Sequence, residues 1–158
     1  MPEITILIEN NYCTTLKNII PTVKKSLYAI IYIAYPHLKR SHDDVKLILD
    51  EIIHATHKGI DVKILFNSIE TKNLVSRANK ISFDYLRKEG VLVKTTEKGR
   101  NTHSKLFLID DNTTITGSHN LSNTSLHQSR EISILIKDEK TNQELKEYFL
   151  KNFYEAKN

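Results

Sequence analysis

Four short apolar runs alternate with longer segments of helical period, and this alternation restricts the fold more than any other feature of the chain. The apolar runs are residues 4–8, 27–35, 60–66 and 91–95. In the segments between them, apolar residues recur every three or four positions, as on one face of an amphipathic helix. Such a β-α-β-α-β-α-β order is typical of a sheet with crossover helices. We therefore expect an α/β fold with a mixed, largely parallel β-sheet flanked by helices.

Residues 27–35 are apolar on both expected faces, which indicates a central strand covered by helices on either side. The helical segment after this run carries boundary signals. Ser41 or Asp43 could serve as its N-cap, and Gly59 fits its C-terminal stop. The sequence thus predicts a helix between the second and third strands.

Beyond residue 95 the pattern changes to hairpin-like β-structure, followed by a strand at 131–136 and a closing helix. Leu145, Phe149 and Phe153 share one face of that helix. No linker, low-complexity tract or long repeat interrupts the 158 residues, a length that supports one real core. We expect a single domain over residues 1–158.

The charge and the cysteine content limit the classes of protein. The formal net charge is +4 and the isoelectric point is near 9.0, a balance that suits nucleic acid or an acidic membrane surface. The single cysteine, Cys13, excludes an intramolecular disulfide and a cysteine-based zinc site. The most apolar run is far shorter than the roughly 20 residues of a membrane span, and no signal peptide is evident. We expect a cytoplasmic protein without a membrane anchor.

Residues 103–120 read HSKLFLIDDNTTITGSHN and look like a hairpin. Polar side chains gather at its start, His103 and Lys105, and at its end, Ser118 and Asn120. If the first half is a strand, alternation places His103 and Lys105 on the same face. Asp110 begins a turn, and Gly117 marks a point where the chain bends or approaches a neighbour closely. A solvated hairpin end would explain a lone His-x-Lys equally well.

The full spacing of this hairpin resembles the signature of the phospholipase D superfamily, often called the HKD motif. That signature is His-x-Lys, four residues, Asp, six residues, then Gly-Ser-x-Asn. Every position matches: His103, Lys105, Asp110, Gly117, Ser118 and Asn120. Residues 37–44 also contain His-x-Lys and an aspartate at the same offset, but no Gly-Ser-x-Asn follows them. The chain therefore holds one complete copy of the motif.

The resemblance extends to most of the chain. Family members usually carry Asn-x-Glu in the strand after the motif, and the matching positions here read Ser129-Arg130-Glu131. The glutamate is retained, whereas serine replaces asparagine, which leaves the role of Ser129 open. The order of elements looks like that of the small single-motif bacterial endonucleases of the superfamily. The resemblance implies a phospholipase D-like catalytic domain and a metal-independent phosphodiesterase.

Phosphodiester cleavage requires a nucleophile, a proton donor and fixed positive charge at the phosphate. The resemblance implies that His103 is the covalent nucleophile, and Glu131 is the best candidate to fix its tautomer. Lys105 would supply a charge, Asn120 an amide donor and Ser118 a hydroxyl to the phosphate.

The other motif positions are expected to support the site. By strand alternation Asp110 faces away from His103, so we expect it to act structurally or as a turn residue, together with Gly117 and Ser129. His119 is not expected to act in catalysis.

No metal or cofactor is expected, because protein cations can replace a Lewis acid at the phosphate. His54 and His57 lie with Glu51 on one expected helix, but a partly exposed amphipathic helix explains them without a ligand role.

One motif provides one histidine, whereas the mechanism implied by the resemblance uses a second to protonate the leaving oxygen. The resemblance therefore implies a homodimer with two His103 side chains facing one phosphate across a two-fold axis.

The substrate class rests mainly on the resemblance. Basic side chains near the motif favour DNA, with RNA left open, because such charges bind phosphate backbones: Lys94, Lys98, Arg100 and Arg130. A solvated basic loop is the alternative explanation for these charges. A phospholipase or phosphatidyltransferase acting on phospholipids, and a non-catalytic nucleic-acid-binding module, remain alternative functions.

Overall fold

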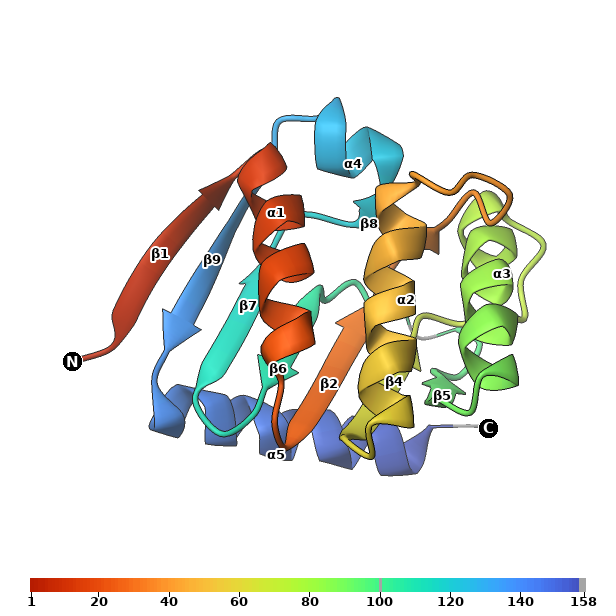
Figure 1. Cartoon of the computed structure of the whole chain (residues 1–158). Coiled ribbons are helices and arrows are strands. Elements are labelled where there is room, and N and C mark those ends of the chain that lie inside the picture. The colour runs from red at the N-terminus through yellow and green to blue at the C-terminus, as the bar shows by residue number, and fades with distance from the viewer. Residues whose placement is uncertain (100, 157–158) are drawn as a thin grey trace.

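The chain forms a seven-stranded sheet with the order β1-β9-β7-β6-β2-β4-β5, seen in the computed structural model, which describes residues 1–99 and 101–156 (Figure 1). The strands are β1 (Glu3–Ile8), β2 (Ser26–Ile31), β4 (Asp61–Phe66), β5 (Leu92–Thr95), β6 (Leu106–Ile109), β7 (Thr113–Gly117) and β9 (Ile132–Lys137). A separate parallel pair joins β3 (Ala34–Tyr35) to β8 (Leu121–Ser122).

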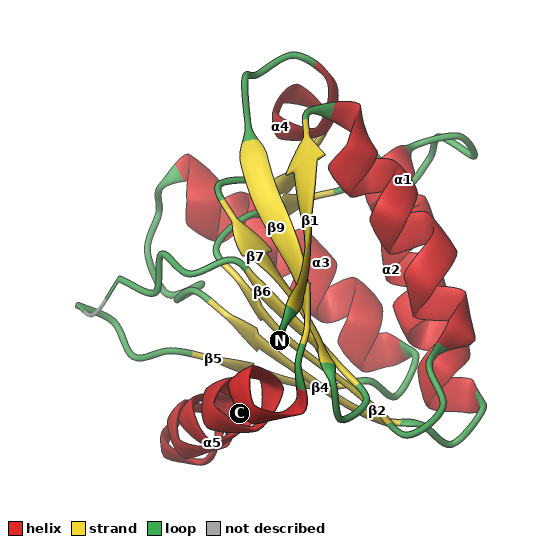
Figure 2. Cartoon of the chain, turned by 90° about the vertical axis from the view of Figure 1, so that its left-hand side faces the viewer, coloured by secondary structure: helices red, strands yellow, loops and turns green. Residues whose placement is uncertain are grey.

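Helices cover the two faces of the sheet unequally. One face carries α1 (Asn10–Ile19), which continues into a short 3-10 turn, together with α2 (Asp44–His57) and α3 (Leu74–Lys88). The other face carries α5 (Glu139–Glu155) alone, and the short α4 (Asn123–His127) sits at one end of the sheet (Figure 2). Within the described part of the chain, no helix is both long and apolar enough to span a bilayer.

The mixed α/β fold is confirmed, but its parallel part is smaller than expected. Within the seven-stranded sheet of the described residues, only β2, β4 and β5 pair in parallel, through the crossovers that contain α2 and α3. The remaining pairs of the sheet, β2–β6, β6–β7, β7–β9 and β9–β1, are antiparallel. The chain leaves β1 through α1 and enters β2 at the fifth position of the sheet. A helix between two apolar runs indicates a crossover, but it does not reveal whether the two strands are neighbours.

Side-chain caps begin the three longest helices, α2, α3 and α5. Asp43, Asn73 and Asp138 each accept a hydrogen bond from the backbone N–H three residues later, at 2.9, 2.8 and 2.8 Å. Of the two candidates for the cap of α2, the structure selects Asp43 over Ser41. Gly59 adopts φ +81° just after α2 and so ends the helix, as the sequence predicts.

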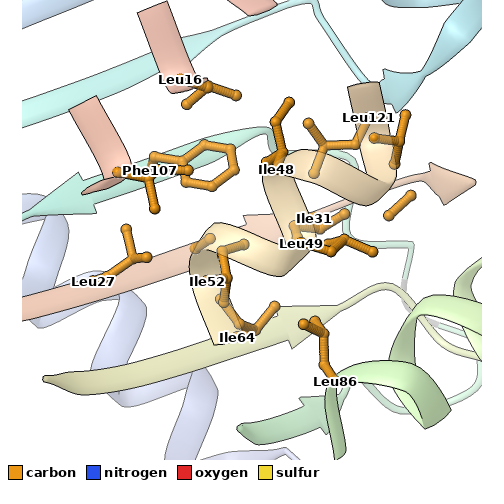
Figure 3. Close-up of a cluster of buried hydrophobic side chains, with 14 of the residues drawn as sticks. Leu16, Leu27, Ile31, Ile48, Leu49, Ile52, Ile64, Leu86, Phe107 and Leu121 are labelled. Atoms are coloured by element: carbon orange, nitrogen blue, oxygen red, sulfur yellow. The ribbon is translucent and has the colours of Figure 1, made fainter. Parts of the chain in front are cut away.

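Two clusters of buried side chains hold the layers together. The larger one fills the space between the sheet and α1, α2 and α3, and includes Leu16, Ile48, Ile52 and Phe107 (Figure 3). The smaller one lies under α5, where Phe149 and Phe153 are buried and Leu145 partly so. Complete burial of one such side chain stabilises the fold by about 1.5–3 kcal/mol. The expected apolar face of the last helix is therefore confirmed.

The apolar run 27–35 does not form one continuous strand. It divides into β2 and β3, and the carboxamide of the fully buried Asn79 on α3 holds the break between them. This side chain accepts from the Ala34 N–H at 2.9 Å and donates to the Tyr32 carbonyl at 2.8 Å. Apolar composition alone could not show the break, because its cause is a polar contact from a distant helix.

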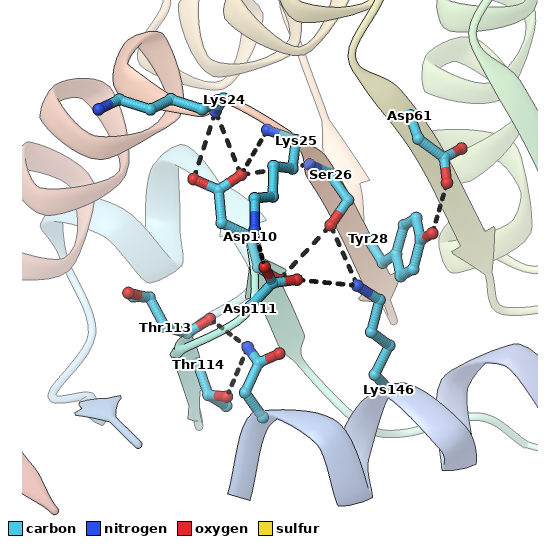
Figure 4. A network of polar contacts seen from close by, with 11 residues as sticks. Lys24, Lys25, Ser26, Tyr28, Asp61, Asp110, Asp111, Thr113, Thr114 and Lys146 are labelled. Atoms are coloured by element: carbon cyan, nitrogen blue, oxygen red, sulfur yellow. Dashed lines mark hydrogen bonds and ion pairs between the residues drawn. The ribbon is translucent and has the colours of Figure 1, made fainter. Parts of the chain in front are cut away.

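Asp110 joins the β6–β7 turn to the start of β2. It adopts φ +53°, and its carboxylate accepts hydrogen bonds from the backbone N–H groups of Lys24, Lys25 and Ser26 at 3.1, 2.7 and 3.2 Å (Figure 4). The motif aspartate therefore lies at the opposite end of β6 from His103. Its carboxylate satisfies backbone donors there that would otherwise depend on water.

Replacement of Asp110 by Ala is expected to lower the free energy of unfolding by about 1–3 kcal/mol, because backbone donors lose their acceptor. The loss of a residue type that tolerates positive φ acts in the same direction. Asp111→Ala is the matched control, since Asp111 forms only exposed ion pairs with Lys25 and Lys146 and should change stability little. Urea unfolding measures both variants. Equal losses in the two would contradict the structural role of Asp110.

Candidate active site

The motif residues meet at one end of the sheet, where β2 and β7 end and β6 and β9 begin. His103 and Lys105 precede β6, Ser118 follows β7, and Glu131 precedes β9. Because β6 pairs antiparallel with β7, and β7 with β9, these flanking segments lie next to one another. The strand register thus brings residues from three segments of the sequence into one region.

His103 and Lys105 form a close pair against an aromatic ring. The Lys105 Nζ lies 3.2 Å from Nδ1 and 3.3 Å from Nε2 of His103, and it donates to the His103 carbonyl at 2.7 Å. The ring of Tyr32 lies 4.3 Å from the imidazole and 4.6 Å from the Lys105 Nζ. The imidazole is exposed, whereas Lys105 is only 9% exposed. An exposed imidazole therefore stands beside a buried ammonium group.

The expected strand from His103 onward is wrong at its start, because regular pairing begins only at Leu106. His103 and Lys105 lie together because the Lys105 side chain folds back onto the preceding residues. His103 and Lys105 thus lie side by side as strand alternation predicts, although the strand itself begins only at Leu106.

Burial lowers the pKa of Lys105 below its ordinary value, and the negative charge of Glu131 opposes part of this shift. Water solvates a partly buried ammonium group poorly. An anion beside this group is therefore stabilised more strongly than an anion beside a surface lysine. A phosphate bound next to His103 would supply that anion.

Asn120 contributes an amide to the same region. Its backbone N–H donates to Ser125 Oγ at 2.8 Å, which fixes its position. Its side-chain Oδ1 is buried and has no hydrogen-bond partner among the described residues. A cavity of about 10 Å³ touches Lys105, Asn120 and Tyr32. A buried amide oxygen without a partner is costly unless a hydrogen-bond donor completes it.

Glu131 is held by two hydroxyl groups. Ser118 Oγ donates to one carboxylate oxygen, and Ser125 Oγ donates to the other at 2.9 Å. Ser118 Oγ also accepts from the Ile132 N–H at 3.1 Å. Within the described part of this chain Glu131 has no hydrogen bond to His103, so its role in fixing the histidine tautomer stays a prediction. Ser129 is half-buried nearby, and its N–H donates to the Thr124 carbonyl at 2.9 Å.

Gly117 lies where β9 approaches β7 most closely. A Cβ atom built at this position would be 2.3 Å from the Ser133 Cα and 2.5 Å from the Ile132 carbonyl oxygen. The expected close approach therefore occurs here. Only a residue without a side chain allows β9 to place Glu131 next to Ser118.

Three supporting residues were not identified from the sequence. Tyr32 is hidden within an apolar run, and Ser125 of the short α4 lies in a polar stretch of sequence without any pattern. Asn67 accepts from the Thr102 N–H at 2.9 Å and thereby positions the segment before His103. Asn67 follows the parallel strand β4, and the carboxyl ends of such strands are frequent positions for functional residues. That position is the one signal that could have revealed it.

His119 borders the same small cavity as Lys105 and Asn120, but its ring is held by other contacts. Its side chain is fully buried, with Nδ1 2.8 Å from Ser133 Oγ and Nε2 3.0 Å from the Glu9 carbonyl oxygen. It also stacks on Tyr12 at 4.3 Å. Burial lowers the pKa of His119, so the ring is neutral and serves packing and hydrogen bonding.

The basic residues expected to bind nucleic acid differ in their exposure and contacts. Lys98 and Arg130 are exposed close to the motif in sequence. Lys94 is half-buried, donates to the Ala156 carbonyl at 3.3 Å and lies over the Phe153 ring, so it packs on α5. Arg100 falls outside the described residues.

A second polar cluster lies between α1, α2 and α4. Ligand-type atoms of Cys13, Asp44 and His127 lie within 4.8 Å of one another. Asp44 already pairs with Lys17 at 2.7 Å and with His127 at 2.8 Å. The ammonium of Lys17 opposes a cation at this position, so the cluster is explained as a network of ion pairs.

The fold and the motif at this end of the sheet are those of a phospholipase D-like domain. Residues 19–153 match the family described as cardiolipin synthase, PLD-like domain. The chain therefore belongs to the phospholipase D superfamily, in its cardiolipin synthase PLD-like domain family.

Cardiolipin synthase A of Buchnera aphidicola subsp. Acyrthosiphon pisum is 32% identical over 108 residues, which cover 68% of this chain and 21% of that protein. The chain thus spans about a fifth of the length of the curated relative that it matches.

Solved structures agree with the fold. Nuc, a phospholipase D family member from Salmonella typhimurium, superposes with a TM-score of 0.82 at 18% identity, over 99% of this chain and 97% of that one. NucT from Helicobacter pylori superposes with a TM-score of 0.75 at 19% identity, over 99% of both chains. At this level of identity the likeness concerns the fold alone.

Replacement of Gly117 by Ala is expected to destabilise the protein by about 1–3 kcal/mol, because the added methyl forces β9 away from β7. It should also shift the NMR resonances of His103 and Lys105. Gly59→Ala is the control: its methyl meets open space, so only the positive φ costs stability and the site resonances stay in place. Unchanged site resonances in Gly117→Ala would contradict the tight packing at this position.

Proposed function

We propose that this chain cleaves phosphodiester bonds of nucleic acid, with DNA as the substrate, through a covalent phosphohistidine intermediate at a site shared by two copies. The observation that carries the proposal is the exposed His103 beside the buried Lys105, with Asn120 lining the same small cavity as Lys105. Nucleophile, cation and amide thus stand at one end of the sheet.

In the proposed reaction, an imidazole nitrogen of His103 attacks phosphorus and the bond to the leaving oxygen breaks. The electron pair goes to that oxygen, which takes a proton from a second histidine. Water then attacks the phosphohistidine, the second histidine accepts its proton, and His103 is released. Lys105 offsets the negative charge that builds on the phosphoryl oxygens, where a metal ion would otherwise be needed.

The proton donor is assigned to His103 of a second copy. Within the described structure, His119 is buried and fully hydrogen-bonded, and His37 pairs with Asp43 at 3.1 Å. Neither lies against the imidazole of His103. A two-fold axis beside His103 would provide an identical histidine, together with a second Lys105.

Nucleic acid is favoured by charge. The chain carries a net charge of +4, and the exposed Lys98 and Arg130 can contact a phosphate backbone beside the site. A phosphatidyl transfer is the second candidate, because curated relatives of this sequence are named cardiolipin synthases. Both reactions use the same attack of His103 on a phosphodiester and differ in the group that accepts the phosphoryl.

The direct test offers purified protein DNA, RNA and phospholipid vesicles in the presence of EDTA. DNA cleavage is expected to persist in chelator and to fall by more than about a thousandfold in His103→Asn, because no other group can form the intermediate. His54→Asn, at an exposed position on α2, is the matched control and should retain full activity. Turnover of phospholipid without DNA cleavage would replace the nuclease by the second candidate.

The pH dependence of kcat/KM tests the role proposed for the Lys105 ammonium. The pKa of this ammonium is lowered by burial, so the charge needed for phosphate binding is lost as pH rises through this lowered value. The alkaline fall of kcat/KM should therefore begin at lower pH than an exposed lysine would allow. In Lys105→Arg the guanidinium stays charged, and the residual activity should show no such fall. The same alkaline limb in both proteins would contradict the assignment.

A further inference from the structure

Tyr32 stands in the break between β2 and β3, where its backbone is held from both sides. Its carbonyl accepts from the side-chain amide of Asn79 on α3 at 2.8 Å. The carbonyl before it accepts from the N–H of Asn67, which follows β4, and the carbonyl after it from the N–H of Leu121 on β8, each at 3.0 Å. Three neighbouring elements therefore fix the direction in which the Tyr32 side chain leaves the backbone.

The Tyr32 ring lies against both side chains of the His-x-Lys pair. The imidazole of His103 lies 4.3 Å from it and is tilted by 55°, and the Lys105 Nζ lies 4.6 Å from the ring centre. The face of an aromatic ring carries partial negative charge and attracts a cation within about 6 Å. Lys105 lies within that range, and a positively charged imidazole of His103 would lie within it too.

The ring is a charge partner that leaves Lys105 free to bind an anion. Lys105 is only 9% exposed, and its Nζ donates to a neutral group, the His103 carbonyl, at 2.7 Å. A carboxylate in contact with this ammonium would stabilise it more strongly, but it would compete with a phosphate for the same group. The face of Tyr32 stabilises the charge without neutralising it.

A second positive charge arises beside Tyr32 in the proposed reaction. One ring nitrogen of His103 bonds to phosphorus while the other keeps its proton, and the leaving oxygen takes the electron pair of its own bond to phosphorus. The imidazole ring thereby becomes cationic, until water breaks the N–P bond. Because this charge develops only during the attack, the ring of Tyr32 interacts more strongly with the transition state than with the ground state, and such an interaction raises kcat.

We propose that Tyr32 is a positioning residue that stabilises two cations in turn: the ammonium of Lys105 in the free protein and the phosphorylated imidazole of His103 during the reaction. The second part rests on the proposed phosphohistidine mechanism, whereas the first part rests on the ring contacts alone. The alternative is a packing role, in which any apolar side chain of similar volume would serve. The two roles differ because only the first depends on the electrons of the ring.

The first test measures the pKa of the Lys105 ammonium by NMR, without any substrate. Tyr32→Phe is the reference, because the proposed role belongs to the ring and not to the hydroxyl. Phenylalanine analogues with an increasing number of ring fluorines then replace it at position 32. Fluorine withdraws electrons from the ring face at almost constant volume, so the ammonium is stabilised less and its pKa should fall with each added fluorine.

The same fluorinated series at Tyr35 is the matched control. Tyr35 is an aromatic residue on the nearby β3, and its ring contacts His37 at 5.3 Å. This series should leave the pKa of Lys105 unchanged. A pKa of Lys105 that does not depend on the fluorine content at position 32 would overturn the first part of the proposal.

The second test measures kcat and KM for DNA cleavage. Tyr32→Phe should retain the wild-type kcat, whereas Tyr32→Leu should lower kcat by about 2- to 30-fold with little change in KM, the range expected for the loss of one cation–π contact. Along the fluorinated series kcat should fall stepwise, which keeps the test valid if leucine disturbs folding. A kcat that is independent of fluorine content would overturn the second part.

The two measurements separate this inference from the proposed function. A wild type that cleaves no DNA, in which the pKa of Lys105 still falls along the series, would refute the nuclease and retain the contact between Tyr32 and Lys105. An active wild type in which neither the pKa of Lys105 nor kcat responds to fluorine would retain the nuclease and leave Tyr32 a packing residue, which overturns the proposal.

Discussion

The antiparallel ladder β6–β7–β9 is the constraint on which the site depends. It places the start of β6, the end of β7 and the start of β9 at one end of the sheet. The contact between Gly117 and Ser133 sets how closely β9 can approach. Because of this approach, Ser118 can hydrogen-bond Glu131 while His103 and Lys105 stand on the neighbouring segment. The positions of the motif in the sequence are thus consequences of strand register.

The two polar ends of the motif hairpin, residues 103–105 and Asp110, have different roles. At one end, His103 and Lys105 carry the chemistry in the proposed mechanism. At the other end, Asp110 binds three backbone N–H groups at the start of β2. That contact anchors the β6–β7 turn, and with it the adjoining end of β6, against the start of the central strand β2. A motif that reads as one unit in sequence therefore combines a reacting group with an anchor about one strand length away.

The sequence allowed prediction of the α/β class, the helices and the motif, because each leaves a local pattern. The apolar periodicity identified α2, and the His-x-Lys spacing identified the pair at the site. The position of β1 next to β9 could not be predicted, since pairing between distant strands has no local signal. Asn79 and Asn67 also escaped notice, because their hydrogen bonds join segments far apart in sequence.

The proposed mechanism needs a second histidine. The described chain places one exposed histidine, His103, beside the buried Lys105. A second copy would supply the other histidine in that mechanism.

The most direct measurement of this account is DNA cleavage by randomly mixed dimers of wild type and His103→Asn. If every site needs His103 from both chains, an equal mixture should retain about a quarter of the activity of the same total amount of wild type. If each chain acts with its own histidine alone, the mixture should retain about half. We expect about a quarter of the wild-type activity, and about a half would contradict a site shared by two chains.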